Sequence, residues 1–521
     1  MKFSKRTAYT LVVLLILLNI TLRYPTTPHE IGWDSFAIHL MTNSISEFKY
    51  AKWWIHPASI GGFYPYSYAS AVPFILSGMS QCTGISIEWV IWLFCVLIGI
   101  FSASTAYLMA GAIKDDDIFK YLVALAYSTS MGILYFTTWT AATRGLFIVL
   151  LPLFIYLLIK CRTSIAKYST LTLILLGVLI AIHHLFYFIA PVVISYIIVT
   201  IFYKLKVHVS FAKIPKKFVY FALPLCFLGM FAIPFFTPGF IKGESKFEWL
   251  LETQLLDYAR MIGLLGIFIV GGLGYLMFKH DKSFEEWFLL IALICLTPLL
   301  HVEIYAKWFF LPFTFLLIGV ALTNIFKTTI KKKKGIASTM VVIILLLSVS
   351  FTGYYQYLHC LDDPNPYKRH MEERTYVGAL WIKDNINDDK NMIAGRFISC
   401  RVFSTSEVPT LTGSGTADLA YGFVDPQKLE VKPVRSPFSV QFYFSNPYKT
   451  INHSLTSSRI NNILNNDINA VSKSWGIRSI PRFNLSYYVE NTDISNTFTR
   501  SVQQTKDNVY DNGKIRVWRL D

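Results

Sequence analysis

The sequence predicts a polytopic all-α membrane bundle of about 11 transmembrane helices, followed by a small α/β domain. Three observations support this fold class. Of the 521 residues, 54% are hydrophobic and 15% are charged, whereas a soluble domain carries about a quarter charged residues. Apolar runs separated by short charged loops continue to residue 358, and the rest of the chain has the composition of a soluble domain. A soluble enzyme, an intrinsically disordered chain and a collagen-like chain are thereby excluded.

Helices are the expected form of the apolar runs, because lipid offers no water to unpaired backbone groups. A helix needs roughly 20 mostly apolar residues to cross the hydrocarbon core. The first run follows the basic stretch 1–6 and has no small-residue cleavage site after it, so we expect a retained signal anchor. The predicted spans are 7–22, 88–111, 118–136, 143–160, 169–185, 187–203, 218–236, 259–278, 285–300, 308–326 and 336–357.

Lysine and arginine set the expected orientation, because cytoplasmic loops carry an excess of both. With a cytoplasmic N-terminus, most basic residues before 358 fall in inner loops, including the run 331–334. The chain is then a multi-pass plasma membrane protein whose C-terminal domain lies on the extracytoplasmic side. The net charge of +16 therefore reflects topology, and no nucleic acid partner is expected. The basic residues in the predicted outer loops are Arg23, Lys49, Lys52, Arg144, Lys242, Lys246, Arg260 and Lys307.

Two segments lie outside the predicted bundle. The first outer loop, 23–87, is long and rich in aromatic residues, and 359–521 is long enough for a domain with its own core. Within the loop, 67–80 is apolar, but counting it as a span would reverse the later loops and remove the charge bias. We therefore expect a juxtamembrane helix there, and a division of the chain into 1–358 and 359–521.

The C-terminal segment predicts a mixed α/β domain. A helix is expected over 371–386, with Val377, Leu380 and Trp381 on one face. The sequence 508–518 predicts a hairpin in which Asn512-Gly513 supplies a type I′ turn. Further strands are expected over 391–394, 438–444 and 487–490.

The first outer loop contains a carboxylate, Asp34, at a position suited to catalysis. Asp34 follows the first span by about a dozen residues and precedes a helical stretch. A carboxylate there can act as a general base that takes a proton from a hydroxyl or amide nucleophile. The alternative is an ordinary N-cap of a helix over 35–45. His39, five residues on, shares a helix face with Asp34 only loosely.

These features resemble the GT-C superfamily of integral membrane glycosyltransferases. The shared pattern is an acidic residue at the head of a long first outer loop, the Tyr64-Pro65-Tyr66 stretch, many spans and an outer C-terminal domain. The superfamily includes protein O-mannosyltransferases, aminoarabinose transferases and the oligosaccharyltransferase catalytic subunit. The resemblance implies that Asp34 is catalytic.

One departure narrows the expected activity. In the oligosaccharyltransferase subunit, a helix similar to 379–386 leads into a Trp-Trp-Asp-Tyr-Gly motif that reads the acceptor sequon. Here the following stretch, 392–399, has no such motif. We therefore expect a polyprenyl-phosphate donor that carries a single sugar, rather than transfer to asparagine in sequons.

A lipid-phosphate donor needs cations near the outer surface, where this topology leaves few. Arg144, Arg260 and Lys307 stand at outer ends of spans and are candidate phosphate ligands. Arginine can hold a phosphate bidentately, whereas lysine acts as a point charge. The alternative for each is a side chain that reaches lipid headgroups without a specific role.

The remaining candidates would contact substrate or metal. His183 and His184 end a span, but neighbouring helix residues point about 100° apart, which disfavours one shared ion. Glu303 stands four residues before Lys307, and the two can simply pair. Aromatic rings of the first outer loop can stack on sugar or form an interfacial belt. The candidate substrate ligands are His39, His56, Tyr64, Tyr66, His183, His184 and Glu303, together with Trp53 and Trp54.

No cofactor motif is present in the sequence, and a divalent cation (Mg²⁺ or Mn²⁺) is left open. Asp115-Asp116-Asp117 resembles a metal-binding triplet but faces the cytoplasm in this topology, so we expect a solvated turn. The predicted function is an inverting transfer of sugar from a polyprenyl-phosphate donor to a protein or glycan acceptor on the outer face. The alternatives are a transporter, a lipid or polymer flippase, an envelope assembly scaffold, or a family member that binds donor without transferring it.

Overall fold

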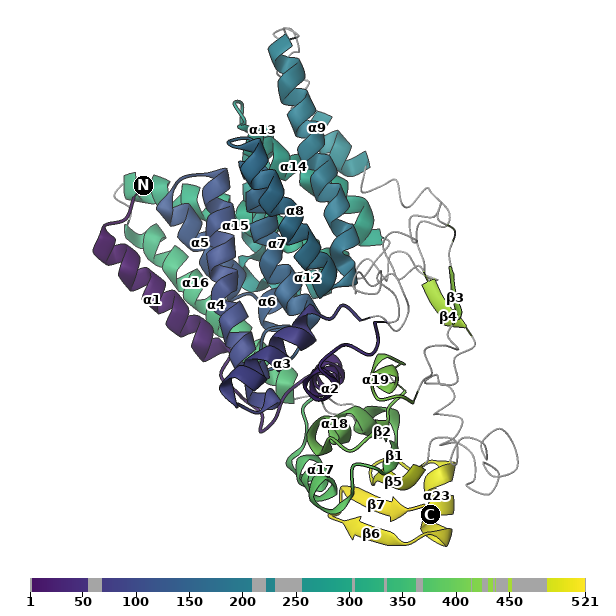
Figure 1. The fold of residues 1–521 in the computed structure, drawn as a ribbon. Coiled ribbons are helices and arrows are strands. Elements are labelled where there is room, and N and C mark those ends of the chain that lie inside the picture. Colours follow the sequence, from purple (N-terminus) through teal and green to yellow (C-terminus); the bar gives the residue numbers. More distant parts are fainter. Residues whose placement is uncertain are drawn as a thin grey trace.

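The computed structural model shows a bundle of long helices with a smaller α/β part at one end (Figure 1). The N-terminus lies at the opposite end of the bundle, and the C-terminus lies in the α/β part. The residues that the structure describes are 2–54, 68–208, 222–229, 255–301, 305–331, 335–361, 369–413, 415–423, 430–433, 436, 448–451 and 485–520.

The bundle is built around two buried helices, α7 and α15. Helix α4 packs between α5 and α7, while α15 packs against α5, α13 and α16. The peripheral helices expose apolar side chains such as Leu14, Ile174 and Leu346, as expected for surfaces that face lipid. The helices are α1 (Lys5–Leu22), α4 (Ile87–Ile113), α5 (Asp117–Ser128), α6 (Met131–Leu134), α7 (Thr143–Lys160), α8 (Ile165–Ile182), η2 (His184–Phe188), α9 (Ile189–His208), α12 (Asp257–Ile262), η5 (Gly263–Gly266), α13 (Ile267–Phe278), α14 (Phe284–Leu296), η6 (Thr297–His301), α15 (Ala306–Lys331) and α16 (Gly335–Leu361).

Eight segments of the described chain are long and apolar enough to cross a membrane, so the predicted count of eleven is not confirmed. The predicted span 118–136 is interrupted after Ser128, where the hydroxyl of Ser130 donates to the carbonyl of Tyr127. Such side-chain bonds compete with the helix ladder. The predicted span 285–300 is a helix of 13 residues followed by a 3₁₀ turn. Most of 218–236 lies outside the described residues. The eight segments are Lys5–Leu22, Ile87–Ile113, Thr143–Lys160, Ile165–Ile182, His184–Leu205, Asp257–Phe278, Ala306–Thr328 and Thr339–Leu358.

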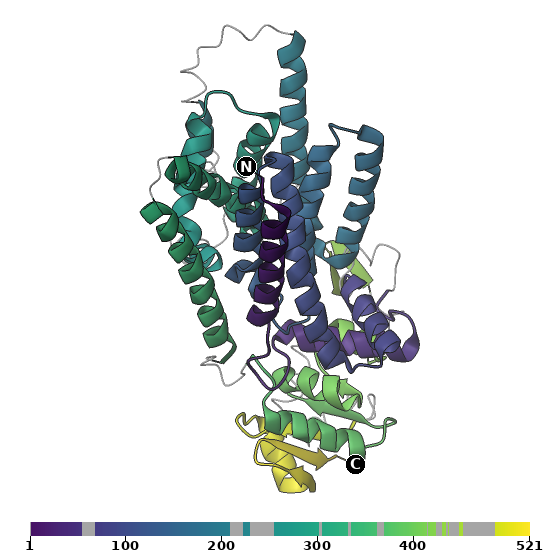
Figure 2. The same ribbon diagram turned by 90° about the vertical axis from the view of Figure 1, so that its left-hand side faces the viewer.

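Two helices of the first long loop lie at the end of the bundle nearest the α/β part. Helix α2 (Trp33–Phe48) runs across the bundle axis between the long helices and the α/β part (Figures 1 and 2). Helix α3 (Ala71–Thr83) packs against α2 and α4. With 13 residues, α3 is too short to span a bilayer, which agrees with the juxtamembrane helix expected over 67–80.

The α/β part contains a five-stranded sheet in the order β2-β1-β5-β7-β6. Strand β1 is parallel to β2 and β5, while β5–β7 and β7–β6 are antiparallel. The predicted helix over 371–386 and the strands over 391–394 and 487–490 are present, whereas 438–444 lies outside the described residues. The elements are α17 (Glu373–Asn385), β1 (Asn391–Ala394), α18 (Arg396–Ser406), β2 (Thr410–Leu411), α19 (Gly415–Ala420), β5 (Leu485–Asn491), α23 (Thr497–Thr505), β6 (Asn508–Asp511) and β7 (Ile515–Arg519), with a separate pair β3 (Glu430–Pro433) and β4 (Tyr448–Ile451).

The predicted hairpin is formed by β6 and β7, but its type I′ turn is wrong. A type I′ turn needs positive φ at both central residues, and here only Gly513 (φ 82°) has it, not Asn512. The side-chain oxygen of Asn512 instead accepts hydrogen bonds from the backbone N–H groups of Lys514 and Ile515. This local bond holds Asn512 in an ordinary conformation and makes the loop three residues long.

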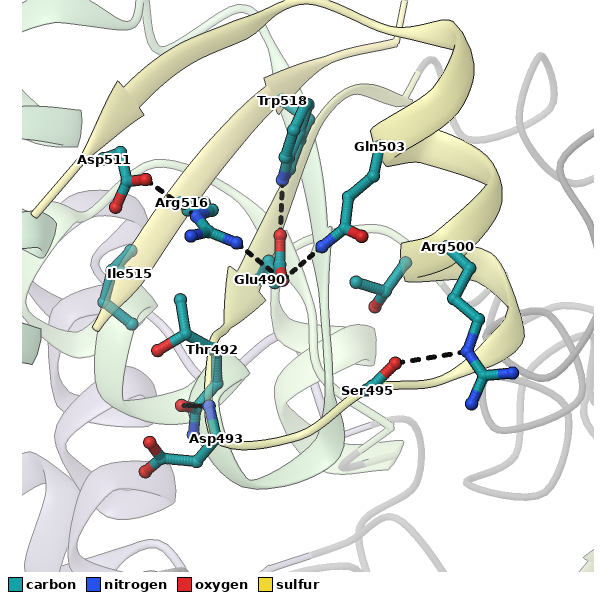
Figure 3. Close-up of polar contacts among 12 residues, drawn as sticks. Glu490, Thr492, Asp493, Ser495, Arg500, Gln503, Asp511, Ile515, Arg516 and Trp518 are labelled. Atoms are coloured by element: carbon teal, nitrogen blue, oxygen red, sulfur yellow. Dashed lines mark hydrogen bonds and ion pairs between the residues drawn. The ribbon is translucent and has the colours of Figure 1, made fainter. Parts of the chain in front are cut away.

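A buried carboxylate ties β5, β7 and α23 together (Figure 3). Glu490 accepts hydrogen bonds from the side-chain amide of Gln503 at 2.9 Å and from the indole N–H of Trp518 at 2.7 Å. The guanidinium of Arg516 lies 3.7 Å away. Because these donors satisfy the buried charge, we read Glu490 as part of the architecture of this domain.

At the opposite end of the bundle, the aspartate triplet is not the solvated turn expected from the sequence. Asp116 is buried, caps the first turn of α5 and pairs with Lys327. Asp115 pairs with Lys2 at 2.7 Å and with Lys120 at 2.9 Å. The triplet is therefore an ion-pair network that ties the N-terminal segment to α5 and α15.

Candidate functional site

Three chain segments meet just ahead of Asp34. The backbone N–H of Ile31 donates to the carbonyl of Trp139 at 2.9 Å, and that of Gly32 donates to the carbonyl of Arg369 at 3.0 Å. Ile31 also forms an antiparallel bridge with His370. We call this arrangement of residues 30–32, 139–141 and 369–371 the three-segment junction. It joins the first long loop, the segment before α7 and the segment before α17.

The backbone of this junction is tightly constrained. Gly32 has a φ of 104°, and a Cβ there would lie 2.6 Å from the Thr140 hydroxyl oxygen, so only glycine fits without displacement. Trp139 is buried with a φ of 42°, while its indole N–H donates to the carbonyl of Glu88. A bulky residue in this region costs of order 1–3 kcal/mol, and such strain clusters at functional sites.

Asp34 is the second residue of α2, and its interpretation as an N-cap is wrong. The N-cap is Gly32, with no side-chain cap bond, so the helix begins at Trp33, before the expected range 35–45. The Asp34 carboxylate is 61% exposed and accepts a hydrogen bond from Nη2 of Arg144 at 2.9 Å. The N-terminus of α2 also favours a negative charge at this position.

Arg144 is held over two aromatic rings. It is the second residue of α7, and its guanidinium lies 4.6 Å from the ring centroid of Tyr305 and 5.3 Å from that of Phe136. Aromatic faces attract a guanidinium and restrict its plane. With 22% of its side chain exposed, Arg144 is partly withdrawn from solvent while one edge bonds to Asp34.

Tyr68 and Tyr305 lie at the candidate site and were not among the candidates selected from the sequence. The hydroxyl of Tyr68 lies 3.4 Å from that of Thr143, which begins α7. Burial and the nearby Asp34 charge raise the pKa of Tyr68 to about 12, so the phenol is neutral at physiological pH. Tyr305 lies two residues before the predicted cation Lys307, but nothing in that spacing shows that its ring supports Arg144.

His183 and His184 lie on the flank of α7. Nδ1 of His183 accepts a hydrogen bond from the N–H of Leu185 at 3.0 Å, and the two imidazole centroids are 4.2 Å apart. The His183 ring also packs against Phe147, three residues beyond Arg144. In the part of the chain that the structure describes, no group of three or more His, Cys, Asp or Glu side chains could hold a metal ion.

Comparison with solved structures decides the fold family. The chain is similar to the Archaeoglobus fulgidus oligosaccharyltransferase tethered with an acceptor peptide containing the NVT sequon, with a TM-score of 0.58, 12% identity, and coverage of 94% of this chain and 70% of that one. It is also similar to ArnT from Cupriavidus metallidurans bound to undecaprenyl phosphate, with a TM-score of 0.58, 10% identity, and coverage of 99% and 98%. Both are GT-C glycosyltransferases. This chain has the GT-C fold.

The family resemblance read from the sequence is thus confirmed at the level of the GT-C fold. No family model matches the sequence, and no curated protein matches it. At 10–12% identity, the likeness concerns architecture, and the roles of individual residues depend on the geometry around Asp34 and Arg144.

The other two predicted phosphate ligands, Arg260 and Lys307, form a separate group. Asp257 pairs with Lys307 at 2.9 Å and with Arg260 at 3.3 Å. Lys307 is almost fully buried, whereas Arg260 is exposed. The Tyr305 ring contacts both the Arg144 guanidinium and the tilted Trp308 ring. The Lys307 ammonium lies 5.1 Å from the Trp308 ring centroid, and Asp257 offsets one of the two positive charges of the second group.

The predicted substrate ligands of the first loop are only partly described. His39 is buried, and its Nδ1 lies 2.7 Å from Oε1 of Glu30, so its ring is engaged in a buried pair and is withdrawn from solvent. Trp53 is fully buried and donates to the Ser70 hydroxyl, which removes it from sugar stacking. Trp54 is exposed. The candidates that lie outside the described residues are His56, Tyr64, Tyr66 and Glu303.

His29 connects the bundle to the α/β part. Its Nδ1 lies 2.9 Å from Glu88 at the start of α4, and its Nε2 lies 3.1 Å from Glu373 at the start of α17. The imidazole also stacks on the Tyr376 ring at 3.9 Å. A neutral imidazole has one N–H donor, whereas the protonated ring has two. Only the protonated form can therefore donate to both carboxylates.

We expect this link to weaken as pH rises. Burial lowers the pKa of His29, but hydrogen bonds and charges from Glu88 and Glu373 outweigh it and raise the pKa above the usual 6.5. The stabilisation is therefore complete below about pH 6.5 and is lost as pH rises through the folded-state pKa. Because Glu373 is exposed, this stabilisation should amount to about 1 kcal/mol.

The measurement is thermal unfolding of the full chain between pH 6 and 9. Wild type should lose melting temperature across this range, and His29→Gln should flatten that loss. His280→Gln is the control, since His280 pairs with its chain neighbour Asp281 and not with Glu88 or Glu373. An equal pH dependence in wild type and His29→Gln would show that His29 does not carry the effect.

Proposed function

We propose that this protein is an inverting GT-C glycosyltransferase that moves a sugar from a polyprenyl-phosphate donor to an acceptor. In this proposal the N-terminus is cytoplasmic, and the α/β part faces outward with the site beneath it. The acceptor is a protein or a glycan presented on the outer face of the plasma membrane. The observation that supports the proposal most strongly is the direct contact between Asp34 and Arg144 at the end of the bundle next to the α/β part.

Asp34 acts as the general base. Its exposed Oδ1 or Oδ2 accepts the proton of the acceptor hydroxyl or amide as that nucleophile attacks the anomeric carbon of the sugar. The new bond joins the acceptor to the anomeric carbon, and the bond between that carbon and the phosphate oxygen breaks. The electron pair leaves with the polyprenyl phosphate, and the configuration at carbon is inverted.

Arg144 stabilises the leaving phosphate. A guanidinium has five N–H donors, so Arg144 can bond to Asp34 through Nη2 while its other edge binds phosphate oxygens. The rings of Tyr305 and Phe136 hold the guanidinium plane, which favours a bidentate contact. We assign the phosphate to Arg144 before Arg260 and Lys307, because Arg144 bonds directly to the proposed base Asp34, whereas Arg260 and Lys307 pair with Asp257.

No step of this proposal passes through a metal ion. Mg²⁺ and Mn²⁺ prefer oxygen ligands such as carboxylates, and the described residues contain no cluster of three or more acidic, histidine or cysteine side chains that fits one. Asp34, the carboxylate at the site, has Arg144 as its counter-ion.

The test begins with binding. Purified full-length protein is heated with undecaprenyl phosphate, with undecaprenol as a control that lacks the phosphate, and with a panel of sugar-loaded carriers. A ligand at 100 times its Kd stabilises the folded state by about 2.7 kcal/mol, so the phosphate carriers should raise the melting temperature and undecaprenol should not. The carrier with the largest shift then serves as donor in a transfer assay with radiolabelled sugar. Absence of any phosphate-specific shift and of any transfer would favour a transporter, flippase or scaffold.

A further inference from the structure

We propose that Ser35 is a positioning residue, which with buried Glu30 fixes the segment that carries Arg144 relative to Asp34. This inference rests on the proposed function, because it concerns the geometry of that same site. Ser35 adjoins Asp34 in the chain, and Ala141 lies three residues before Arg144. A direct hydrogen bond between Ser35 and Ala141 therefore links the segment that carries the proposed base, Asp34, to the segment that carries the proposed phosphate ligand, Arg144.

The Ser35 hydroxyl uses both of its hydrogen-bonding capacities in this link. Its oxygen accepts the backbone N–H of Ala141 at 2.8 Å, and its proton is donated to Oε2 of Glu30 at 2.8 Å. All three residues are almost completely buried. A hydroxyl that accepts from one side and donates to the other is oriented without ambiguity, so it joins the two segments rigidly.

Glu30 is itself anchored from several directions. Its Oε1 lies 2.7 Å from Nδ1 of His39, on the next turn of α2 beyond Ser35. Its backbone N–H donates to Glu88 at 3.2 Å, and its carbonyl accepts the N–H of Met371 at 3.4 Å. Because both the backbone and the carboxylate of Glu30 are held, the residue provides a stationary acceptor for the Ser35 proton.

The Ser35–Ala141 bond matters because α2, which carries Asp34, and α7, which carries Arg144, do not pack chiefly against each other. Helix α2 packs chiefly against α3 and α18, and α7 packs chiefly against α4 and α8. Packing of the helix bodies therefore leaves the relative position of their first turns to the three-segment junction. The backbone bond from Ile31 to Trp139 fixes one point of contact, and the Ser35–Ala141 bond fixes a second point closer to Asp34 and Arg144.

The test compares Ser35→Ala with Ser44→Ala in the full-length protein. Ser44 is on the same helix and fully buried, and its hydroxyl donates to the carbonyl of Ala420 in the α/β part at 3.4 Å. Ser44→Ala therefore removes a buried hydroxyl from the same helix, as Ser35→Ala does. The hydrogen bond that it removes does not involve the segment that carries Arg144. Readouts are hydrogen exchange of the peptide covering 139–142, kcat and KM for the sugar donor, and the melting temperature.

We expect Ser35→Ala to expose the amide of Ala141 to faster exchange and to lower kcat roughly 10- to 100-fold, since small misplacements of reacting groups cost rates of this order. KM for the donor should change far less, because Arg144 keeps its charge and its aromatic supports. Ser44→Ala should match wild type in exchange at 139–142 and in kcat. If Ser35→Ala does not fold, Ser35→Cys fills the same space with a thiol, which donates and accepts hydrogen bonds only weakly, and should give the same kcat effect.

Three results would overturn the inference while leaving the proposed function intact: wild-type exchange in Ser35→Ala, wild-type kcat in Ser35→Ala, or an equal loss of kcat in Ser44→Ala. A wild-type protein that transfers no sugar from any phosphate carrier would overturn the proposed function, and the inference with it. The two failures are distinguished by the activity of the unmodified protein.

Discussion

Replacing Asp34 with Asn should lower sugar transfer by about 10²- to 10⁴-fold or more, because an amide cannot accept the acceptor proton. The Asn side chain has nearly the same shape, and its carbonyl oxygen can still accept the Nη2 hydrogen of Arg144. The position is mostly exposed, so folding should be unaffected. The measurement is kcat in the transfer assay, together with the thermal shift caused by undecaprenyl phosphate.

The matched control is Glu285→Gln. Glu285 also lies in the first turn of a helix, α14, and pairs with an arginine, Arg162, at 3.1 Å. Arg162 follows the far end of α7, so this pair is remote from Asp34. We expect Glu285→Gln to keep wild-type kcat. Full activity in Asp34→Asn would falsify the general-base mechanism, whereas equal losses in both variants would point to an effect of removing any such ion pair.

Replacing Arg144 with Ala should lower kcat by roughly 10²- to 10³-fold, the range seen when a group that stabilises transition-state charge is removed. It should also abolish the stabilisation by undecaprenyl phosphate, because among the described residues Arg144 is the cation that bonds to Asp34. Arg144→Lys should recover only part of both effects, since lysine keeps the charge but loses the fork-shaped contact and the aromatic stacking.

Arg162→Ala is a close control for Arg144→Ala. Arg162 lies 4.0 Å from the ring centroid of Phe284 and 5.6 Å from that of Tyr203, and it bonds to Glu285. It thus repeats the surroundings of Arg144 at the other end of α7. Arg162→Ala should leave phosphate binding and kcat unchanged. Retention of phosphate-dependent stabilisation in Arg144→Ala would instead assign the donor phosphate to Arg260 and Lys307.

Asp34 and Arg144 were selected as candidates from the sequence because charge is rare in the predicted outer loops. A carboxylate after the first span and an arginine before the fourth are conspicuous against an apolar background. Their contact supports the active-site interpretation over a helix cap or a headgroup anchor. The pattern could not show their contact, because the two residues are 110 positions apart in the chain.

The supporting residues could not be found in this way. Glu30, Ser35 and Tyr305 have ordinary neighbours in the sequence, and their importance arises only where three distant segments meet. His39 was selected as a substrate ligand because a histidine near a candidate base attracts attention, yet its partner Glu30 lies nine residues earlier and draws it inward. The start of α2 was also misplaced, since the helix begins directly after Gly32, which makes no side-chain cap bond.

The three-segment junction also governs how the protein can be dissected. Composition suggests a cut after residue 358, at the end of the last apolar run. The bridge between Ile31 and His370, and the bond from Gly32 to Arg369, show that the first residues after that cut complete the backbone scaffold of the bundle-borne site. A truncated bundle that ends at 358 would leave the segment before Asp34 without its bridge to His370 and its bond to Arg369. Chimeras that exchange the C-terminal domain should therefore be joined beyond Met371, so that each bundle retains its own stretch of 369–371.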